Sequence, residues 1–536
     1  MAAPRIETRT RTNGDGTEAR SDRGRCRILV LACVAAVSVV GSILLIGQSP
    51  HGVHASPDSF TYLSAATNLA RGQGWTYAFG ETGAPITLFP PLYSLLLTLP
   101  ELLGVQTFDW VLWQNAFLLW ALSFAVGVTV LEATGGSLVP ALLAIFLVQL
   151  GTPTTTAYAH IWSEPLFYPI VVIVLAALAR YLASGRTLWL VIAAASTSAG
   201  MLTRYAGLSV FVAACVLLLG WPGQSVVGRA RRTGLFVAIA IPLSGLWVMR
   251  NLATSGTLTG DNKLVHSLSG EEVVEGLRTI ASWFLPLPPE GGTPWFLLLF
   301  TASFVLLLVL FLPSMLRPER LASFRLPPVV AVCSVYAVTH FVFLMAANAF
   351  STRSPPFNDR ILGSAFAPMV IAVVVLGHAM WDALAGRRVH QAVLLAVGSC
   401  LLALSVVAAT GTMPLLYASE QGTLPYYRRI SRSFEGVITP DSVLLSNRAN
   451  IAWFLTGRPA ASLPRSCRGG QILPNPEYDR ELRDLATDLG DSPRQVIFFR
   501  RSPRCEPFSL NGLREALRSE HVGPKDEVFV LEGPAS

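Results

Sequence analysis

The chain has 536 residues, of which 52% are hydrophobic and only 14% are charged, and its mean hydropathy is +0.51. Soluble proteins of this size carry about a quarter of charged residues, so this composition indicates an integral membrane protein. The net charge of +7 comes almost entirely from arginine, and the apolar composition argues against nucleic-acid binding. The seven cysteines show no CxxC or His-rich spacing, so no metal site or redox motif is predicted.

The N-terminus, residues 1–27, is polar and rich in arginine, and it is predicted to be a disordered basic tail. The apolar run at 28–47 follows it and is long enough to cross a bilayer. No small-residue cleavage site clearly follows that run. We therefore interpret it as a retained anchor and not as a cleaved signal peptide.

Apolar stretches of spanning length recur along the chain and predict about eleven transmembrane helices, since one crossing needs roughly 20 apolar residues. They lie near 28–47, 109–131, 137–151, 165–182, 187–203, 205–221, 234–250, 294–312, 327–347, 361–381 and 390–410. The run at 90–103, opened by two prolines, is too short to cross. It predicts an interfacial or re-entrant helix.

Arginines in alternate loops set the expected orientation, because cytoplasmic loops carry an excess of basic residues. With the N-terminus in the cytoplasm, the basic loops after 182, 221, 312 and 381 all fall on that side. If 90–103 crossed the membrane, every later basic loop would lie outside. The prediction is therefore a transmembrane domain at 28–414 in the cell membrane, with 48–107 as its first extracytoplasmic loop and 415–536 outside.

This topology places ionisable residues from distant parts of the sequence on one outer face. They include Asp58, His160, Glu164, Arg204, Arg250 and Arg360. Ionisable residues at membrane edges are costly and often functional. A single arginine at a helix end can also simply reach the lipid phosphates. For the set beside an acid-bearing loop, we favour a functional site.

The stretches SPDSFTYLSAATNLARGQGW (56–75) and FPPLYSLLL (89–97) resemble the first extracytoplasmic loop of GT-C glycosyltransferases. The resemblance is closest to the bacterial members, like those of glycosyltransferase family 39, that are grouped with protein O-mannosyltransferases and lipid A aminoarabinose transferases. The segments SEPLF (163–167), MLTRYAGL (201–208) and TGRPA (456–460) are also similar to segments of those proteins. Many relatives have two adjacent acids in the loop, whereas Ser59 follows Asp58 here.

The resemblance implies an enzyme that uses a polyprenyl-phosphate-linked sugar and a cavity at the outer membrane edge where donor and acceptor meet. Helices lying flat at 59–71 and 90–103 would bound this cavity, with Asp58 between them. Asp58 is the candidate general base, because a carboxylate can make an acceptor hydroxyl nucleophilic. Its alternative role is a helix N-cap, which the run Ser56-Pro57-Asp58 also fits.

The departing phosphate requires cations, and arginine forks suit two oxygens at once. Arg204, Arg360 and Arg250 are the candidates in that order, while Arg71 either binds substrate or contacts lipid headgroups. Glu164 is a second catalytic candidate that orients an acceptor hydroxyl or pairs with an arginine. Alternatively, Glu164 only complements a helix dipole.

Three further residues complete the candidate substrate-binding set. Tyr62 lies in the loop that carries the resemblance. His160 is more simply a loop histidine, since no second His or Cys stands at metal-ligand spacing. Tyr93 is most simply an interface anchor. Whether a divalent metal takes part stays open.

The polar tail, 415–536, predicts a small extracytoplasmic α/β domain. Strands are expected at 443–447, 495–500 and 527–533, and helices at 478–489 and 511–519. Cys467 and Cys505 could pair in an oxidising compartment.

The favoured function is a glycosyltransferase that moves a sugar to an acceptor hydroxyl on a glycan, lipid or protein. A lipid or solute transporter or flippase, and a non-catalytic membrane scaffold, are the alternatives. No Walker-type loop, Rossmann fingerprint or DxD motif stands near the cytoplasmic loops, which argues against a nucleotide-sugar donor and an ATP-driven transporter. Neither the sugar nor the acceptor is specified by the sequence.

Overall fold

The computed structural model describes thirteen segments of the chain. These are residues 14–222, 225–259, 269–284, 327–349, 356–384, 388–417, 419–432, 436–464, 467–468, 473–489, 494–499, 520–521 and 528–532. The predicted span at 294–312, the predicted helix at 511–519 and the predicted Cys467–Cys505 pair therefore lie wholly or partly outside the described residues.

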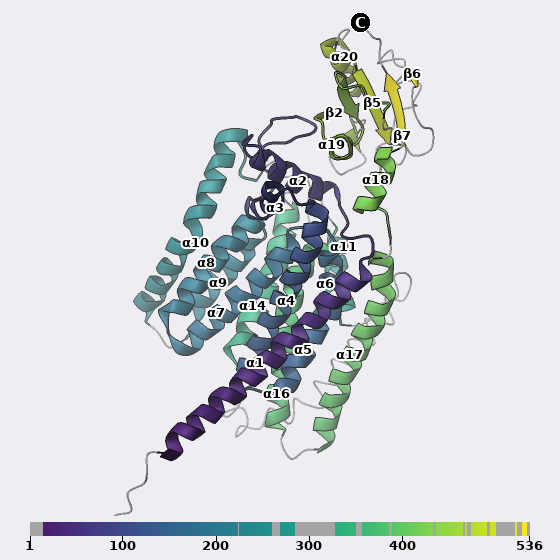
Figure 1. Ribbon diagram of the computed structural model, residues 1–536. Helices are drawn as coiled ribbons and strands as arrows, with labels where there is room; N and C mark the ends of the chain where they lie inside the picture. Colours follow the sequence, from purple (N-terminus) through teal and green to yellow (C-terminus); the bar gives the residue numbers. More distant parts are fainter. Residues whose placement is uncertain are drawn as a thin grey trace, which may run out of the picture.

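A bundle of long apolar helices forms the body of the protein (Figure 1). Seven helical stretches of the described chain are long and apolar enough to cross a membrane. They lie in α1 (Gly14–Gln48), α4 (Thr107–Ala133), α7 (Glu164–Ser184), α10 (Val226–Ser255), α14 (Pro328–Ala349), α15 (Asp359–Leu362) continuing through η1 (Gly363–Ala365) into α16 (Phe366–Ala383), and α17 (Arg388–Tyr417). The prediction of a multi-pass helical membrane protein is confirmed.

The predicted count of eleven spans is not confirmed. α8 (Thr187–Thr203) and α9 (Gly207–Gly220) have only 17 and 14 residues. The predicted span at 137–151 is the first half of a pair, α5 (Leu138–Leu150) and α6 (Thr152–Tyr158), bent by 55°. The bend falls at Gly151, where a Cβ atom would lie 2.2 Å from the Phe366 ring, so only glycine lets that ring approach.

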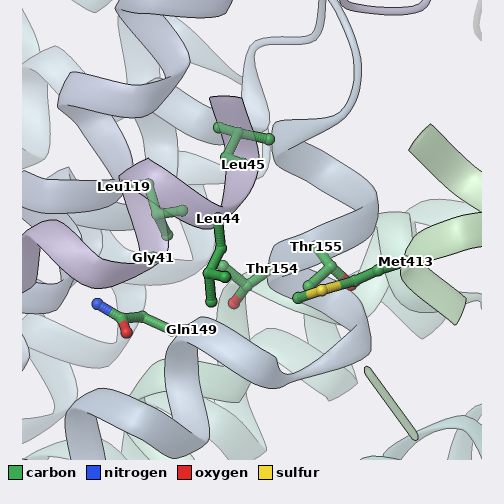
Figure 2. Close-up of a pocket in the computed structure, with 8 residues that line it drawn as sticks. All are labelled: Gly41, Leu44, Leu45, Leu119, Gln149, Thr154, Thr155 and Met413. Atoms are coloured by element: carbon green, nitrogen blue, oxygen red, sulfur yellow. The ribbon is translucent and has the colours of Figure 1, made fainter. Parts of the chain in front are cut away.

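A small cavity of about 10 Å³ lies beside this bend, between α1, α4, α5, α6 and α17. Figure 2 shows the Gln149 amide, Thr154 and Met413 around it. The Gln149 Nε2 donates to the Ser38 carbonyl at 3.0 Å, which ties α5 to α1. A cavity of this size holds at most about one water molecule, so it is a packing feature of the bundle.

Two shorter helices, α2 (Pro57–Ala70) and α3 (Leu92–Leu103), lie across one end of the bundle, between α1 and α4 in the chain (Figure 1). They correspond to the helices expected at 59–71 and 90–103. α3 buries Tyr93 and Leu97 and exposes Leu95, Leu99, Leu102 and Leu103. An apolar outer face of this kind suits a helix that rests in the membrane interface.

The C-terminal unit contains a five-stranded sheet with strand order β2-β1-β5-β7-β6. The strands are β1 (Val443–Ser446), β2 (Ala460–Ser462), β5 (Arg494–Phe499), β6 (Glu520–His521) and β7 (Val528–Glu532). β1 runs parallel to β2 and β5, whereas β7 is antiparallel to β5 and β6. β3 (Cys467–Arg468) and β4 (Leu473–Pro474) form a separate pair, and the helices are α18 (Leu424–Arg432), α19 (Ala449–Thr456) and α20 (Tyr478–Leu489). The predicted α/β character is confirmed.

This unit is docked on the loop that carries α2 and α3, and Figure 1 shows both at the same end of the molecule. The Phe60 ring of α2 packs against Tyr427 and Phe454, with centroids 5.6 and 5.5 Å away. The backbone of Gly80 donates to the Ala460 carbonyl at 2.8 Å. Because these contacts bury one continuous core, the C-terminal unit holds α2 in place from its outer side.

Candidate active site

Four charged side chains from four distant segments form one ion-pair network at this end of the bundle. Asp58 lies in the first turn of α2, Glu164 opens α7, Arg204 separates α8 from α9, and Arg360 lies in α15. Arg360 Nη2 donates to Asp58 Oδ2 at 2.6 Å, and its Nε donates to Glu164 Oε1 at 2.8 Å. Arg204 Nη1 lies 2.7 Å from the same Glu164 oxygen. The network therefore joins two carboxylates and two guanidinium groups.

Glu164 is the buried centre of this network, because its side chain is only 1% exposed. A buried carboxylate is tolerated when cations compensate its charge, and two guanidinium groups do so here. Its second oxygen, Oε2, is buried and has no hydrogen-bond partner within the described part of the chain. Buried polar atoms are nearly always paired, so this unpaired oxygen sets the centre of the network apart from an ordinary structural ion pair.

The local fold around Arg204 explains how its side chain reaches Glu164. α8 ends at Thr203, Arg204 adopts an extended backbone with φ −150° and ψ 141°, and α9 begins at Gly207. A Cβ atom at Gly207 would lie 2.6 Å from the backbone of Gly200. The two glycines thus permit the chain to reverse tightly between α8 and α9. Arg204 lies in this connection, and its Nη1 also donates to Ser163 Oγ at 2.9 Å.

Arg360 is held by contacts on both its backbone and its side chain. The Asn358 side chain caps the short helix α15 by accepting from the Arg360 and Ile361 amides at 3.2 and 3.3 Å. The guanidinium lies over the Trp162 ring, 4.2 Å from its centroid. Its neighbour Asp359 accepts instead from Trp283 Nε1 at 2.8 Å, on the turn after α11 (Gly270–Ser282).

The start of α2 leaves the Asp58 carboxylate available. The N-cap residue is Ser56, so Asp58 is not the capping residue. The Ser59 hydroxyl accepts from the Ser56 amide and donates to the Ile161 carbonyl, each at 2.8 Å. Ser59 thus has a buried backbone-binding role here. The Asp58 side chain remains 30% exposed and contacts Arg360.

Two buried tyrosines extend the network. Tyr62 on α2 and Ser163 share a hydrogen bond between their hydroxyls at 3.0 Å, and the Tyr93 ring meets Tyr62 edge to face at 4.9 Å. The Tyr93 hydroxyl is buried without a hydrogen-bond partner among the described residues. Burial raises the pKa of both phenols, so they are neutral hydrogen-bonding groups and not bases.

The remaining predicted residues lie apart from the ion pairs. Arg250 donates to the backbone carbonyls of Ile86 and Trp75 at 2.6 and 3.3 Å and so holds the first loop. Arg71 is at the other end of α2 from Asp58, about 20 Å away at the usual helical rise. His160 stacks on Trp162 at 3.9 Å, and burial lowers its pKa to about 4, so it is a neutral support for that ring.

Sequence reasoning did not select Ser163 or Trp162, which contact Arg204 and Arg360 respectively. Their sequence signal is their position immediately before Glu164, and Ser163 also opens the SEPLF segment. In the part of the chain that the structure covers, no three His, Cys, Asp or Glu side chains gather in a way that could hold a metal ion.

No protein-family model matches the chain, and no curated protein matches it. Solved structures do. ArnT from Cupriavidus metallidurans bound to undecaprenyl phosphate is similar with a TM-score of 0.55 at 15% identity, covering 94% of this chain and 98% of that one. The apo form of the same protein gives a TM-score of 0.48, again at 15% identity, over 95% and 98%. Over nearly its whole length, the chain therefore shares the fold of the ArnT structure that holds undecaprenyl phosphate.

Proposed function

We propose that the protein is a glycosyltransferase that moves a sugar from a polyprenyl phosphate to an acceptor hydroxyl at the outer edge of the cytoplasmic membrane. The observation that carries this proposal is the carboxylate of Asp58 paired with Arg360, which shares the buried carboxylate of Glu164 with Arg204. ArnT is a lipid A aminoarabinose transferase, and its structure with undecaprenyl phosphate supports the donor class.

In this proposal the acceptor oxygen attacks C1 of the sugar while the bond from C1 to the phosphate oxygen breaks. Asp58 takes the proton of the attacking hydroxyl as general base. Arg204 and Arg360 bind the phosphate that leaves as polyprenyl phosphate, because guanidinium forks suit its oxygens. Stabilising the developing charge in this way is worth on the order of 3 kcal/mol per donor.

Glu164 acts in this scheme as a positioning residue. Its Oε1 atom binds both guanidinium groups, and it is too deeply buried to reach a hydroxyl beyond them. Arg360 uses its Nε and one Nη2 hydrogen on the two acids, so other donors of its fork stay available for a phosphate oxygen. Asp58 is the more exposed acid and is the one placed to meet an acceptor.

The orientation is part of the proposal. Exposed arginines gather at the opposite end of the bundle, where Arg180 pairs with Glu132 after α7 has crossed. Arg25, Arg27, Arg186, Arg229 and Arg231 belong to the same end. The positive-inside rule assigns that end to the cytoplasm, which supports a site on the outer side of the membrane.

The test is Asp58→Asn, which keeps the shape of the side chain and removes the base. We expect the rate of sugar transfer to fall by about 100-fold or more, since general-base catalysis contributes at least that much. The matched control is Asp109→Asn, because Asp109 is an exposed acid in the first turn of α4. Each variant is expressed in a host that lacks the native gene, and envelope glycans are compared by mass spectrometry. Full restoration of the glycan by Asp58→Asn would refute the assigned base.

A further inference from the structure

A second cavity, of about 160 Å³, lies where the first loop meets the C-terminal unit. α2 contributes Thr67 to its lining, and Arg71 follows directly after that helix. Glu101 comes from the end of α3, and Phe108 comes from the start of α4. Trp453 and Phe454 of α19 close the opposite wall. This cavity is separate from the ion-pair network, since it lies beside the C-terminal half of α2, whose first turn carries Asp58.

The polar lining of this cavity is arranged on one side. The Glu101 carboxylate accepts from the Thr67 and Thr107 hydroxyls at 3.3 and 2.5 Å, so it is fixed in place. The Arg71 guanidinium is exposed and has no side-chain hydrogen bond or ion pair within the described ranges. An oriented carboxylate and an unused cation therefore face the same space.

The other side of the cavity is aromatic. Trp453 packs on Phe79 with a centroid distance of 5.7 Å, and Phe454 packs on Phe108 at 5.2 Å, so these rings form a rigid apolar wall. An engineered cavity of about 150 Å³ holds a benzene ring, which means that the space here admits one six-membered ring. A purely apolar ring would leave Arg71 and Glu101 unused, and a bare phosphate would leave the aromatic wall unused.

We propose that this cavity is a carbohydrate subsite that binds one anionic pyranose unit of a glycan. The apolar C–H face of the sugar ring lies on the aromatic wall, and its hydroxyls donate to Glu101. Its carboxylate or phosphate pairs with the Arg71 fork, which suits either group. The subsite lies about 20 Å along α2 from Asp58. Its role as a contact for the acceptor glycan rests on the proposed function, whereas binding of the sugar to this cavity does not depend on that function.

Binding is measured on the purified full-length protein in nanodiscs of neutral phosphatidylcholine, by saturation-transfer NMR with methyl β-D-glucuronide. Arg71→Ala removes the cation, and Thr67→Phe fills the cavity. We expect each to weaken binding by about tenfold or more, because Arg71→Ala removes the partner of the anionic group and Thr67→Phe occupies the space of the sugar ring. Arg428→Ala is the matched control, since Arg428 is an exposed arginine of α18 outside the cavity.

Two further probes identify what the cavity recognises. Methyl β-D-glucoside has the ring without the charge, and glycerol 3-phosphate has the charge of a lipid headgroup without the ring. We expect both to bind at least about tenfold more weakly than the glucuronide. The proposal is overturned if either probe binds as tightly as the glucuronide, or if the native protein does not bind the glucuronide. It is also overturned if Arg71→Ala and Thr67→Phe bind the glucuronide as tightly as the native protein does. Asp58→Asn separates the two proposals, because it should abolish transfer and leave glucuronide binding intact.

Discussion

Replacing Glu164 by glutamine removes one charge from the centre of the ion-pair network and changes little of its shape. In the native protein, Glu164 Oε1 lies 2.7 and 2.8 Å from Arg204 and Arg360. Each hydrogen bond to a charged group is worth about 1.5–3 kcal/mol, and breaking a buried pair leaves the partner charge uncompensated. The arginine side chains are 19% and 21% exposed, so water relieves part of this penalty. We expect a loss of about 3 kcal/mol in the free energy of unfolding.

The same substitution at Glu132 is the control. Glu132 pairs with Arg180 at 2.6 Å, but its side chain is 44% exposed, and the pair lies at the protein surface. Exposed pairs contribute less than about 1 kcal/mol, so Glu132→Gln should have little effect. Both variants are compared by equilibrium unfolding of the purified protein in mixed micelles titrated with SDS.

The result also separates positioning from packing. With Glu164→Gln, the two arginines lose their common anchor, so the Michaelis constant for the donor should rise together with the loss of stability. Equal destabilisation by Glu164→Gln and Glu132→Gln would refute the reasoning. It would mean that burial of the carboxylate does not increase the contribution of the ion pair to the free energy of unfolding.

Three other variants test separate parts of the structure. Gly207→Ala places a Cβ atom 2.6 Å from the Gly200 backbone and should destabilise the protein by about 1–3 kcal/mol while displacing Arg204, so an unchanged melting temperature would contradict the proposed tight turn. His160 has a folded pKa of about 4, below the unfolded value of about 6.5, so the native protein should lose stability as the pH falls from about 6.5 to 4. His160→Asn should remove up to about 3 kcal/mol of that fall. If the native protein and His160→Asn lose the same melting temperature between about pH 7 and pH 4, His160 is not the cause of the fall. Arg250→Ala frees two loop carbonyls and should speed limited proteolysis at 72–89, whereas an unchanged cleavage rate would show that the loop does not depend on this arginine.

Sequence periodicity located most of the helices and strands, because each depends on the apolar character of its own residues. Long spans such as 109–131 and 390–410 correspond to α4 and α17, and the short run at 90–103 corresponds to α3. The strands predicted at 443–447 and 495–500 match β1 and β5. The outer-face set of ionisable residues also contained all four members of the ion-pair network.

The pairing of those residues was decided by tertiary structure. The sequence offered three arginines as phosphate-binding cations at helix ends, but Arg250 binds loop carbonyls while Arg204 and Arg360 bind Glu164. The break between α8 and α9 that presents Arg204 depends on a close approach of Gly207 to Gly200. Such contacts depend on how whole helices are placed against one another, which local hydropathy does not encode.

For the C-terminal unit too, the sequence indicated the elements and tertiary packing decided their contacts. Composition separated 415–536 from the membrane helices, and alternating apolar residues indicated its strands. Its contact with the first loop joins aromatic residues such as Phe60 and Phe454, almost 400 positions apart. Local hydropathy specifies which segments cross the membrane or fold outside it. The partners of each charge and each aromatic ring arise only when those segments pack, because burial and pairing energies depend on distances between remote parts of the chain.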